Sequence, residues 1–382
     1  MIYLDNAATS WPKPENVYRV MDDFMRTKAG NPGRGSHSLA VAAGDAVERT
    51  RMLAARLIKA AEIIRVIFTL NCTHALNLAL RGFLAAGDHV VTSCIEHNSL
   101  ARPLRQMELG GVGVTRVPIS RDTGVTSAGD IEAAVTRDTR LVAVTHASNV
   151  NGVVQPVEEY GEVARRHNLL LLVDAAQTAG KYPIDVESAR IDLLAFSGHK
   201  GLFGPPGVGL LYIGPRAELK CLCEGGTGSY SELEEQPDVL PDKFEIGTAN
   251  SVGISGLGAG LDFVLSEGVE KIRAHGLSLA DRLIEGLSRI RGVALSGVFK
   301  KAARVPIVSF VVAGYDPAEA GVILDQFFDI KARTGLHCAP AAHRSLGTFP
   351  SGTIRLSPGY FNTLEEIEFT LKAVEKIAAS RR

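Results

Sequence analysis

The chain has 382 residues, 46% of them hydrophobic and 22% charged, which is ordinary for a soluble globular protein and predicts one large and one smaller domain. Lys and Arg (41) nearly balance Asp and Glu (42), so we expect no nucleic-acid partner. The first residues do not resemble a signal peptide and the apolar runs are too short to span a bilayer, so we expect a cytoplasmic protein without a membrane partner.

The alternation of apolar runs with amphipathic stretches between residues 63 and 213 predicts a mainly parallel sheet with helices on both faces. The predicted strands are 64–69, 89–93, 112–119, 141–145 and 169–173, and the predicted helices are 73–84, 99–109, 128–135 and 157–167. Right-handed βαβ units follow from this alternation.

The later segments predict a hairpin and a second, smaller α/β unit. Runs 193–196 and 208–213 flank a Gly/Pro turn, so one antiparallel strand is expected in the sheet. The Gly- and acid-rich segment 214–250 is typical of an excursion from the core. The remaining predicted elements are a long helix over 257–290 with a weak point near Gly268, a strand over 305–312 and a closing helix over 364–379.

The five cysteines are an odd number, too few for a disulfide framework in a chain of this size. The pair Cys221 and Cys223 lacks the spacing and the second pair of a zinc site, so we expect no metal. We expect four of the five to be buried as small apolar residues, namely Cys72, Cys94, Cys221 and Cys223. Cys338 is considered separately below.

Reactive residues follow several predicted strands, where sites on open α/β sheets lie. Thr73 and His74 stand between a strand and a helix, where free N–H groups and the Thr73 hydroxyl suit an anion. The alternative is that Thr73 is only the helix N-cap. No glycine-rich dinucleotide fingerprint or P-loop is present, which disfavours a nicotinamide dehydrogenase.

Two further strand ends carry His97 and Asp174. His97 is placed to stack on an aromatic ligand or to move a proton, and the alternative is a surface-loop histidine. A carboxylate at the end of an apolar strand needs an N–H or cationic partner, and for Asp174 a protonated pyridine nitrogen would serve. Alternatively, Asp174 caps a following helix.

The run Ser197-Gly198-His199-Lys200 follows the last of these strands. A lysine placed there becomes a nucleophile and Schiff-base former when burial lowers its pKa, whereas the alternative is an ordinary loop lysine. Ser197 and His199 suit a phosphate beside it. Four strand-end sites that fit one ligand favour pyridoxal 5'-phosphate bound to Lys200.

These motifs resemble those of a known family. Asp174-Ala175-Ala176-Gln177 followed by Ser197–Lys200 is similar to the signature of class V, fold-type I pyridoxal-phosphate enzymes, and most similar to cysteine desulfurases and selenocysteine lyases. The resemblance runs from Leu4-Asp5-Asn6-Ala7-Ala8-Thr9 through Arg34–His37 to Arg355 and Tyr360–Thr363. It implies a cofactor-binding large domain over 15–255 with a mainly parallel sheet, and a smaller α/β domain formed by 1–14 and 256–382.

The resemblance also implies roles for individual residues. Lys200 would carry the cofactor, Asp174 would pair with its pyridine nitrogen, Gln177 would bond its phenolic oxygen and His97 would stack on its ring. The phosphate would be held by Thr73, His74, Ser197, His199 and, from a partner subunit, Thr248, which implies a homodimer. Asn149 and Arg355 would bind the substrate carboxylate, a task that suits the planar fork of arginine.

The segment Arg333–Pro340 resembles the loop that carries the nucleophilic cysteine of short-loop desulfurases, with Leu336 where the family more often has His. A thiol must ionise to attack sulfur, and we expect His337, His343 and a cationic cofactor site to lower the pKa of Cys338. Gly335 and Pro340, in a segment without strand or helix pattern, argue against the alternative that Cys338 is a buried core residue.

The predicted function is therefore a desulfurase that converts L-cysteine to L-alanine, leaves a persulfide on Cys338 and passes the sulfur to an acceptor. An iron–sulfur cluster assembly scaffold or a sulfur-carrier protein would be such an acceptor. Three alternatives remain: a selenocysteine lyase acting on L-selenocysteine, another class V enzyme that needs Lys200 and Asp174 but not Cys338, such as an aminotransferase or epimerase, and a non-catalytic cofactor-binding protein.

Overall fold

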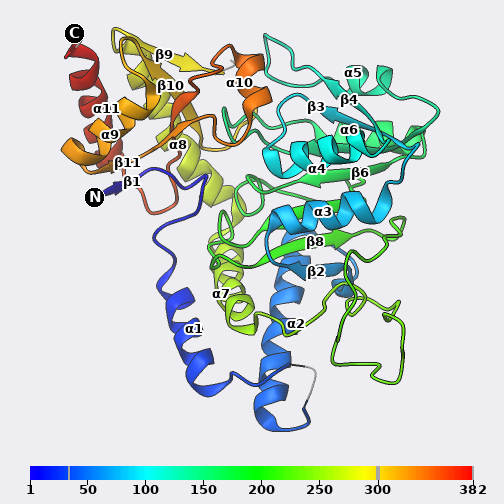
Figure 1. Cartoon of the computed structure of the whole chain (residues 1–382). Coiled ribbons are helices and arrows are strands. Elements are labelled where there is room, and N and C mark those ends of the chain that lie inside the picture. Colours follow the sequence, from blue (N-terminus) through cyan, green and yellow to red (C-terminus); the bar gives the residue numbers. More distant parts are fainter. Residues whose placement is uncertain (33–34, 298–301, 381–382) are drawn as a thin grey trace.

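The computed structural model describes residues 1–32, 35–297 and 302–380, and its centre is a seven-stranded sheet (Figure 1). The sheet has the order β2-β8-β7-β6-β5-β3-β4. Strand β8 runs antiparallel to both neighbours and all other pairs are parallel. This confirms the mainly parallel sheet and its one antiparallel strand. The strands are β2 Val66–Thr69, β3 His89–Ser93, β4 Gly113–Val117, β5 Thr139–Thr145, β6 Leu170–Asp174, β7 Leu193–Ser197 and β8 Gly209–Ile213.

Both faces of this sheet are buried because the strands are apolar at consecutive positions. In β6, Leu171 and Val173 join one hydrophobic cluster, whereas Leu170 and Leu172 join another on the opposite face, since successive strand side chains point to opposite sides. Burying each such side chain stabilises the fold by about 1.5–3 kcal/mol. The flanking helices between the strands are α3 Cys72–Phe83, α4 Asn98–Leu109, α5 Ala128–Ala133 and α6 Val157–Arg166.

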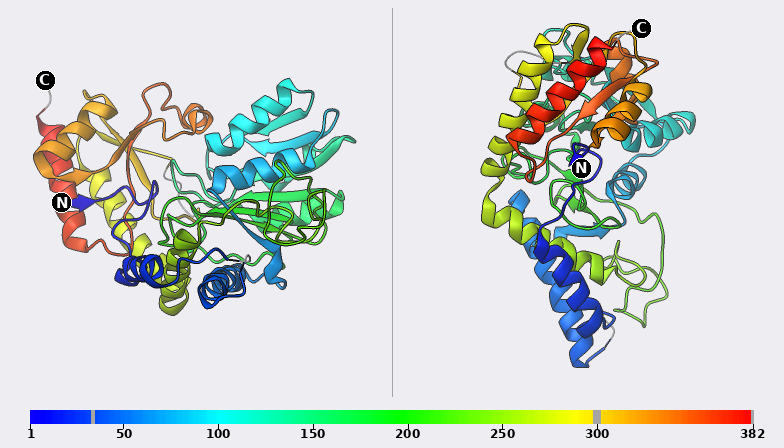
Figure 2. Two further views of the ribbon diagram at one scale, coloured as in Figure 1. Left: turned by 60° about the horizontal axis from the view of Figure 1, so that its bottom comes forward. Right: turned by 90° about the vertical axis from the view of Figure 1, so that its left-hand side faces the viewer.

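A second, smaller unit is built on a four-stranded antiparallel sheet of order β12-β13-β10-β9. Residues Ile2–Tyr3 form β1, which pairs with β11, so the N-terminus lies in this unit (Figures 1 and 2). Of the shorter elements of this unit, only β10 and α11 are predicted from the sequence. The shorter elements are β9 Val293–Ser296, β10 Val308–Val312, α9 Pro317–Phe328, β11 Ile330–Lys331, β12 Arg333–Gly335, α10 Pro340–Leu346, β13 Thr353–Leu356 and α11 Leu364–Ala379.

The long helix predicted over 257–290 is two helices, α7 Ser251–Glu267 and α8 Val269–Arg289, which meet at an angle of 82°. The break falls at the predicted weak point, because Gly268 has a φ of 85°, which favours glycine. The domain boundary expected at residue 255 falls within α7. Among the described residues no single helix is long and apolar enough to cross a membrane, although α7 and α8 taken together pass that test.

Helix α7 packs against α1 Glu15–Thr27 and α2 Ser38–Ile58 along the lower edge of the molecule in Figure 1. Close approach requires small residues here: a Cβ on Gly258 would lie 2.5 Å from Oγ1 of Thr50. That hydroxyl donates to the backbone oxygen of Ile254 at 3.1 Å. Arg34, the first residue of one of the family-like motifs, lies outside the described residues.

Segment 214–250 contains no helix or strand and extends away from the sheet, as expected of an excursion (Figure 1). It carries Cys221, which is partly buried, and Cys223, which is exposed. Cys94 is also partly exposed and only Cys72 is buried. The prediction that all four are core residues is therefore wrong for three of them, because they lie in the excursion or in the turn after β3.

Candidate active site

A cavity of about 180 Å³ opens at the carboxyl ends of β5, β6 and β7, beside the start of α3. Parallel strands end at one edge of the sheet, so residues far apart in sequence meet there. The predicted site residues that line it are Thr73, His97, Asn149, Asp174, Gln177, Ser197, His199 and Lys200. His74, Thr248, Arg355 and Cys338 do not line this cavity.

Asp174 is the last residue of β6 and is buried. Its Oδ1 accepts the backbone N–H of Ala176 at 2.9 Å and the thiol of Cys72 at 3.4 Å, and its Oδ2 accepts the hydroxyl of Ser99 at 3.5 Å. The expected N–H partner is thus present. The alternative of a helix cap is wrong, because a turn rather than an α-helix follows β6.

Lys200 follows β7 and lines the same cavity. Burial lowers the pKa of the Lys200 amine, and the nearby Asp174 carboxylate opposes this effect. A buried amine is more often neutral than a solvated one, and only the neutral amine attacks a carbonyl or takes a proton. The position therefore suits Schiff-base chemistry better than that of an ordinary loop lysine.

His97 is itself the N-cap of α4, because its Nδ1 accepts the backbone N–H of Ser99 at 3.0 Å. A ring nitrogen that accepts cannot carry a proton, so in the neutral ring the proton sits on Nε2. Burial lowers the pKa of His97 to about 4, with the Asp174 carboxylate opposing. At neutral pH the side chain is a flat, uncharged ring, the form suited to stacking.

The start of α3 provides the anion end of the cavity. Asn71 caps this helix by accepting the backbone N–H of His74 at 2.9 Å, so the interpretation of Thr73 as the cap is wrong. The Thr73 hydroxyl bonds no other described residue and remains able to bind a phosphate at the helix N-terminus.

His74 and Thr248 line a separate cavity of about 130 Å³. The Nδ1 atom of His74 accepts the backbone N–H of Leu70 at 3.3 Å, and burial lowers the pKa of the ring. Within one chain these two residues thus line a different cavity from Lys200. Their contact with the cofactor remains a prediction.

Two buried atoms in the Lys200 cavity lack a hydrogen-bond partner among the described residues: Oε1 of Gln177 and Nδ1 of His199. Gln177 is held by its Nε2, which donates to the backbone oxygen of Ala7 at 3.0 Å. Unpartnered buried polar atoms are costly, by about 1–3 kcal/mol each, unless a ligand satisfies them. Together with a carboxylate, an amine and an anion site, they fit pyridoxal phosphate.

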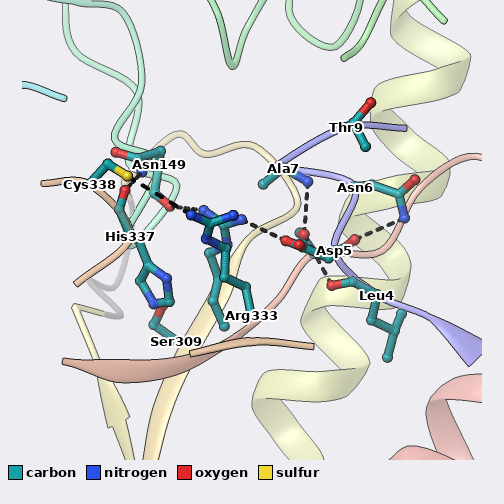
Figure 3. A network of polar contacts seen from close by, with 12 residues as sticks. Leu4, Asp5, Asn6, Ala7, Thr9, Asn149, Ser309, Arg333, His337 and Cys338 are labelled. Atoms are coloured by element: carbon teal, nitrogen blue, oxygen red, sulfur yellow. Dashed lines mark hydrogen bonds and ion pairs between the residues drawn. The ribbon is translucent and has the colours of Figure 1, made fainter. Parts of the chain in front are cut away.

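Arg355 lies on β13 and is 2% exposed. Its Nη2 contacts Oδ1 of Asp5 at 2.7 Å and its Nη1 donates to the backbone oxygen of Asn149 at 3.0 Å, whereas its Nε has no partner among the described residues. Figure 3 shows Asp5 and Asn149 on opposite sides of this network. Two contacts fix the guanidinium and leave the Nε–H free for a carboxylate.

Asn149 links this network to the cysteine loop. Its side-chain Nδ2 donates to the backbone oxygen of His337 at 2.6 Å (Figure 3). One of its two N–H groups is therefore engaged by the loop, and one remains for the predicted contact with a substrate carboxylate.

Cys338 stands between β12 and α10 in a tight turn and is exposed, so the alternative of a buried core residue is wrong. His337 and Cys338 have φ values of 48° and 59°, a left-handed conformation that costs non-glycine residues energy. Three hydrogen bonds hold the turn: the bond from Asn149, the 2.7 Å bond from the backbone N–H of Asn98 to the oxygen of Cys338, and the 2.9 Å bond from the backbone N–H of Ala339 to the oxygen of Leu336.

The cavity beside Cys338, about 410 Å³, shares Thr73, His97 and Ser99 with the cavity of Lys200. The guanidinium of Arg333 lies beside the thiol, with its Nη2 at 3.9 Å from Sγ (Figure 3). The nucleophile candidate thus lies next to the ring-stacking candidate.

The expectation that His337 and His343 act as cations on Cys338 is wrong. Both rings are buried, and burial lowers the pKa of His337 to about 2 and that of His343 to about 4. Their ring nitrogens bond Thr353 at 2.9 Å and Thr348 at 2.7 Å. The guanidinium of Arg333 is the cationic group in contact with the thiol.

Comparison with known proteins places this geometry in a family. Residues 2–369 match the family described as aminotransferase class-V. The chain is 38% identical to a probable cysteine desulfurase of Methanothermobacter thermautotrophicus, over 99% of this chain and 94% of the relative, and 36% identical to one of Halalkalibacterium halodurans, over 98% and 93%. The chain belongs to the class-V aminotransferases, in the cysteine desulfurase family.

Solved structures agree with this assignment. The apo structure of a cysteine desulfurase from Thermococcus onnurineus superposes with a TM-score of 0.91 at 34% identity, covering 99% of this chain and 94% of that one. The cysteine desulfurase CsdA of Escherichia coli gives a TM-score of 0.88 at 26% identity, covering 100% and 95%. The predicted family and fold are confirmed.

Sequence reasoning missed two residues of this desulfurase-family site, Asp5 and Arg333. Asp5 belongs to the quoted Leu4–Thr9 motif and Arg333 opens the quoted cysteine-loop motif, so a signal was present. Nothing in either motif indicates that Asp5 contacts Arg355, which is 350 residues away. Nothing in the structure explains the presence of Leu336 at its position.

Proposed function

We propose that this chain is a pyridoxal-phosphate-dependent cysteine desulfurase, which converts L-cysteine to L-alanine and transfers the sulfur to Cys338. The single observation that carries the proposal is the position of the exposed Cys338 thiol, in a cavity that shares the His97 ring with the cavity of Lys200. A class V enzyme that did not transfer sulfur would need the Lys200 cavity but no thiol there.

The cofactor would be held by Lys200 at its aldehyde carbon, by Asp174 at its pyridine nitrogen and by Thr73 at its phosphate. When bound, pyridoxal phosphate draws electrons from the Cα atom of an amino acid and so makes the Cα–H bond acidic. The unpartnered atoms of Gln177 and His199 support this assignment, because a polar ligand would satisfy them.

The substrate carboxylate would bind the free Nε–H of Arg355. Lys200, with its lowered pKa, would take the Cα proton as its neutral amine. The Cys338 thiolate would then form an S–S bond to the substrate sulfur while the Cβ–S bond breaks. Overall, L-cysteine and the Cys338 thiol become L-alanine and a Cys338 persulfide, so no outside oxidant or reductant is needed.

A homodimer is proposed because Thr248 lies apart from Lys200 within the chain and would instead complete the phosphate site of the other protomer. We also propose that the persulfide passes its sulfur to an iron–sulfur scaffold or sulfur-carrier protein in the cytoplasm. Sedimentation of the purified protein tests the dimer: a monomer at assay concentration would contradict it.

The test of the function is L-alanine formation from L-cysteine by the cofactor-loaded enzyme, followed by mass spectrometry for ~32 Da added at Cys338, as expected for sulfur transfer to a nucleophilic thiolate. Transamination or racemisation without alanine formation would point to another class V activity. A rate with L-selenocysteine that exceeds the rate with L-cysteine would point to a selenocysteine lyase.

A further inference from the structure

A second cavity, of about 20 Å³, adjoins Lys200 and is lined by residues from both units of the fold. Lys181 reaches it from the segment between β6 and β7, and Arg273 reaches it from α8. None of the residues that line it is Asp or Glu. The volume suits one water or one halide ion and is too small for a phosphate group.

Lys181 is only 7% exposed. Its Nζ makes no hydrogen bond or ion pair with any other residue in the described part of the chain. Lysine is almost never buried in this way unless it is paired. The Nζ is thus a donor on an almost fully buried side chain, and it has no acceptor among the described residues.

The side chain of Arg273 also carries a donor without an acceptor. Its Nε is buried and bonds no other described residue, and its guanidinium stacks over the ring of Tyr182 at 4.7 Å. The acidic residue Glu267 does not line the cavity, because it bonds Lys271 at 2.6 Å and the hydroxyl of Tyr360 at 2.7 Å. Three basic side chains, Lys181, Lys200 and Arg273, therefore border one small cavity, and no protein carboxylate is in its lining.

We propose that this cavity is a binding site for one small monovalent anion of halide size, held between Nζ of Lys181 and the guanidinium of Arg273. The anion would satisfy two unpartnered donors and neutralise buried positive charge. Because Lys181 belongs to the large unit and Arg273 to α8, the anion would also connect the two units. The site lies next to the cofactor cavity, with which it shares Lys200, and anion binding there does not depend on the proposed function.

Binding would be coupled to a proton. Burial, together with the charges of Lys200, Arg355 and Lys13, lowers the pKa of Lys181 to about 7, and Arg273 adds a further positive charge at the cavity. An anion favours the protonated amine. Halide affinity should therefore be greatest below pH 7 and fall by up to about tenfold per pH unit above it, since one proton must bind with the anion.

The experiment uses the cofactor-loaded full chain. Calorimetric titration and the line width of chlorine NMR would measure chloride binding at constant ionic strength, with gluconate as the replacing anion. Anomalous diffraction from crystals soaked in bromide would locate the ion within hydrogen-bond distance of Nζ of Lys181. Lys181→Met should weaken chloride binding by about tenfold or more, the effect of losing one charge-assisted hydrogen bond.

Arg273→Gln gives a second reading should Lys181→Met fail to fold, and it should weaken binding to a similar extent. Lys271→Met is the matched control, because it removes one lysine charge from the exposed face of the same helix and should leave chloride binding unchanged. No bromide peak at this cavity, or equal chloride binding in wild type and both cavity variants, would overturn the proposal.

Discussion

The two halves of the active site are held in different ways. Asp174 is the last residue of the buried strand β6, and Lys200 lies in the turn directly after the buried strand β7, so the sheet fixes where both stand. Cys338 sits in a strained turn of left-handed residues held by hydrogen bonds from Asn149 and Asn98. The difference suggests that the cofactor site is preformed, whereas the position of the nucleophile depends on a few bonds that single substitutions can remove.

The largest effect on the rate of alanine formation should come from a substitution in the half of the site that the sheet holds. Lys200→Ala removes the group proposed both to hold the cofactor and to take the Cα proton, so alanine formation should fall by at least about a thousandfold, since general base catalysis alone contributes about 10²–10⁴. Alanine production and the absorbance of bound cofactor measure this. Retention of more than a tenth of the activity would contradict the role of Lys200.

The Cys338→Ser variant separates sulfur transfer, which needs Cys338, from removal of the Cα hydrogen, which needs Lys200. Sulfur transfer should be abolished because a serine hydroxyl does not form a persulfide. Exchange of the Cα hydrogen of L-cysteine with deuterated water should continue at near the wild-type rate, because it needs only the Lys200 cavity. If exchange and desulfuration fell together, Cys338 would act earlier in the reaction than proposed.

The Asn149→Ala variant tests whether the turn of His337 and Cys338 has to be held in place. It removes the bond to the His337 oxygen, and misplacing a reacting group by about 1 Å can cost up to about a hundredfold in rate. We expect persulfide formation to fall about ten- to a hundredfold, with a smaller loss in Cα hydrogen exchange. Equal losses in both would assign Asn149 to substrate binding alone, without a role in the turn.

Asp5→Asn tests the partner of Arg355. The carboxylate holds a guanidinium that is 2% exposed, and removing one partner of a buried pair costs about 3–5 kcal/mol of stability. KM for L-cysteine should rise about tenfold while kcat changes less, because the contact orients Arg355, the residue proposed to bind the substrate carboxylate. Asp5→Glu, which keeps the charge, should restore part of the affinity. A fall in KM would show that Asp5 competes with the substrate.

The smallest effect on catalysis concerns Glu96, a buried residue next to His97 whose Oε1 accepts the Ser93 hydroxyl. Burial raises the pKa of Glu96 to about 8 from its ordinary 4.5. The folded protein then binds a proton that the unfolded chain releases, so stability should decline between about pH 4.5 and 8. The slope is at most about 1.4 kcal/mol per pH unit. Urea unfolding of Glu96→Gln should lack this decline; equal pH profiles for variant and wild type would contradict it.

The sequence predicted the sheet well because its strands are apolar on both faces, and the strand-end residues Thr73, His97, Asp174 and Lys200 follow directly from that pattern. It did not predict β12 or β13, which are short and contain polar residues such as Arg333 and Arg355. The sequence also could not predict that the His337 ring is uncharged, because its burial depends on tertiary packing. Contacts such as Asp5 with Arg355 arise only when the N-terminal segment returns to the small unit.

The N-terminal segment sets a limit on how far the two units can separate. The backbone N–H of Asn6 donates to Ser357 in the small unit, and that of Ser10 donates to His199 in the large unit. Only four residue steps join these two anchors, and a fully extended chain covers at most about 3.6 Å per step, or roughly 14 Å. While both bonds hold, the Ser357 and His199 backbone can move apart only as far as this short segment reaches, so any opening of the two units has to pivot about it.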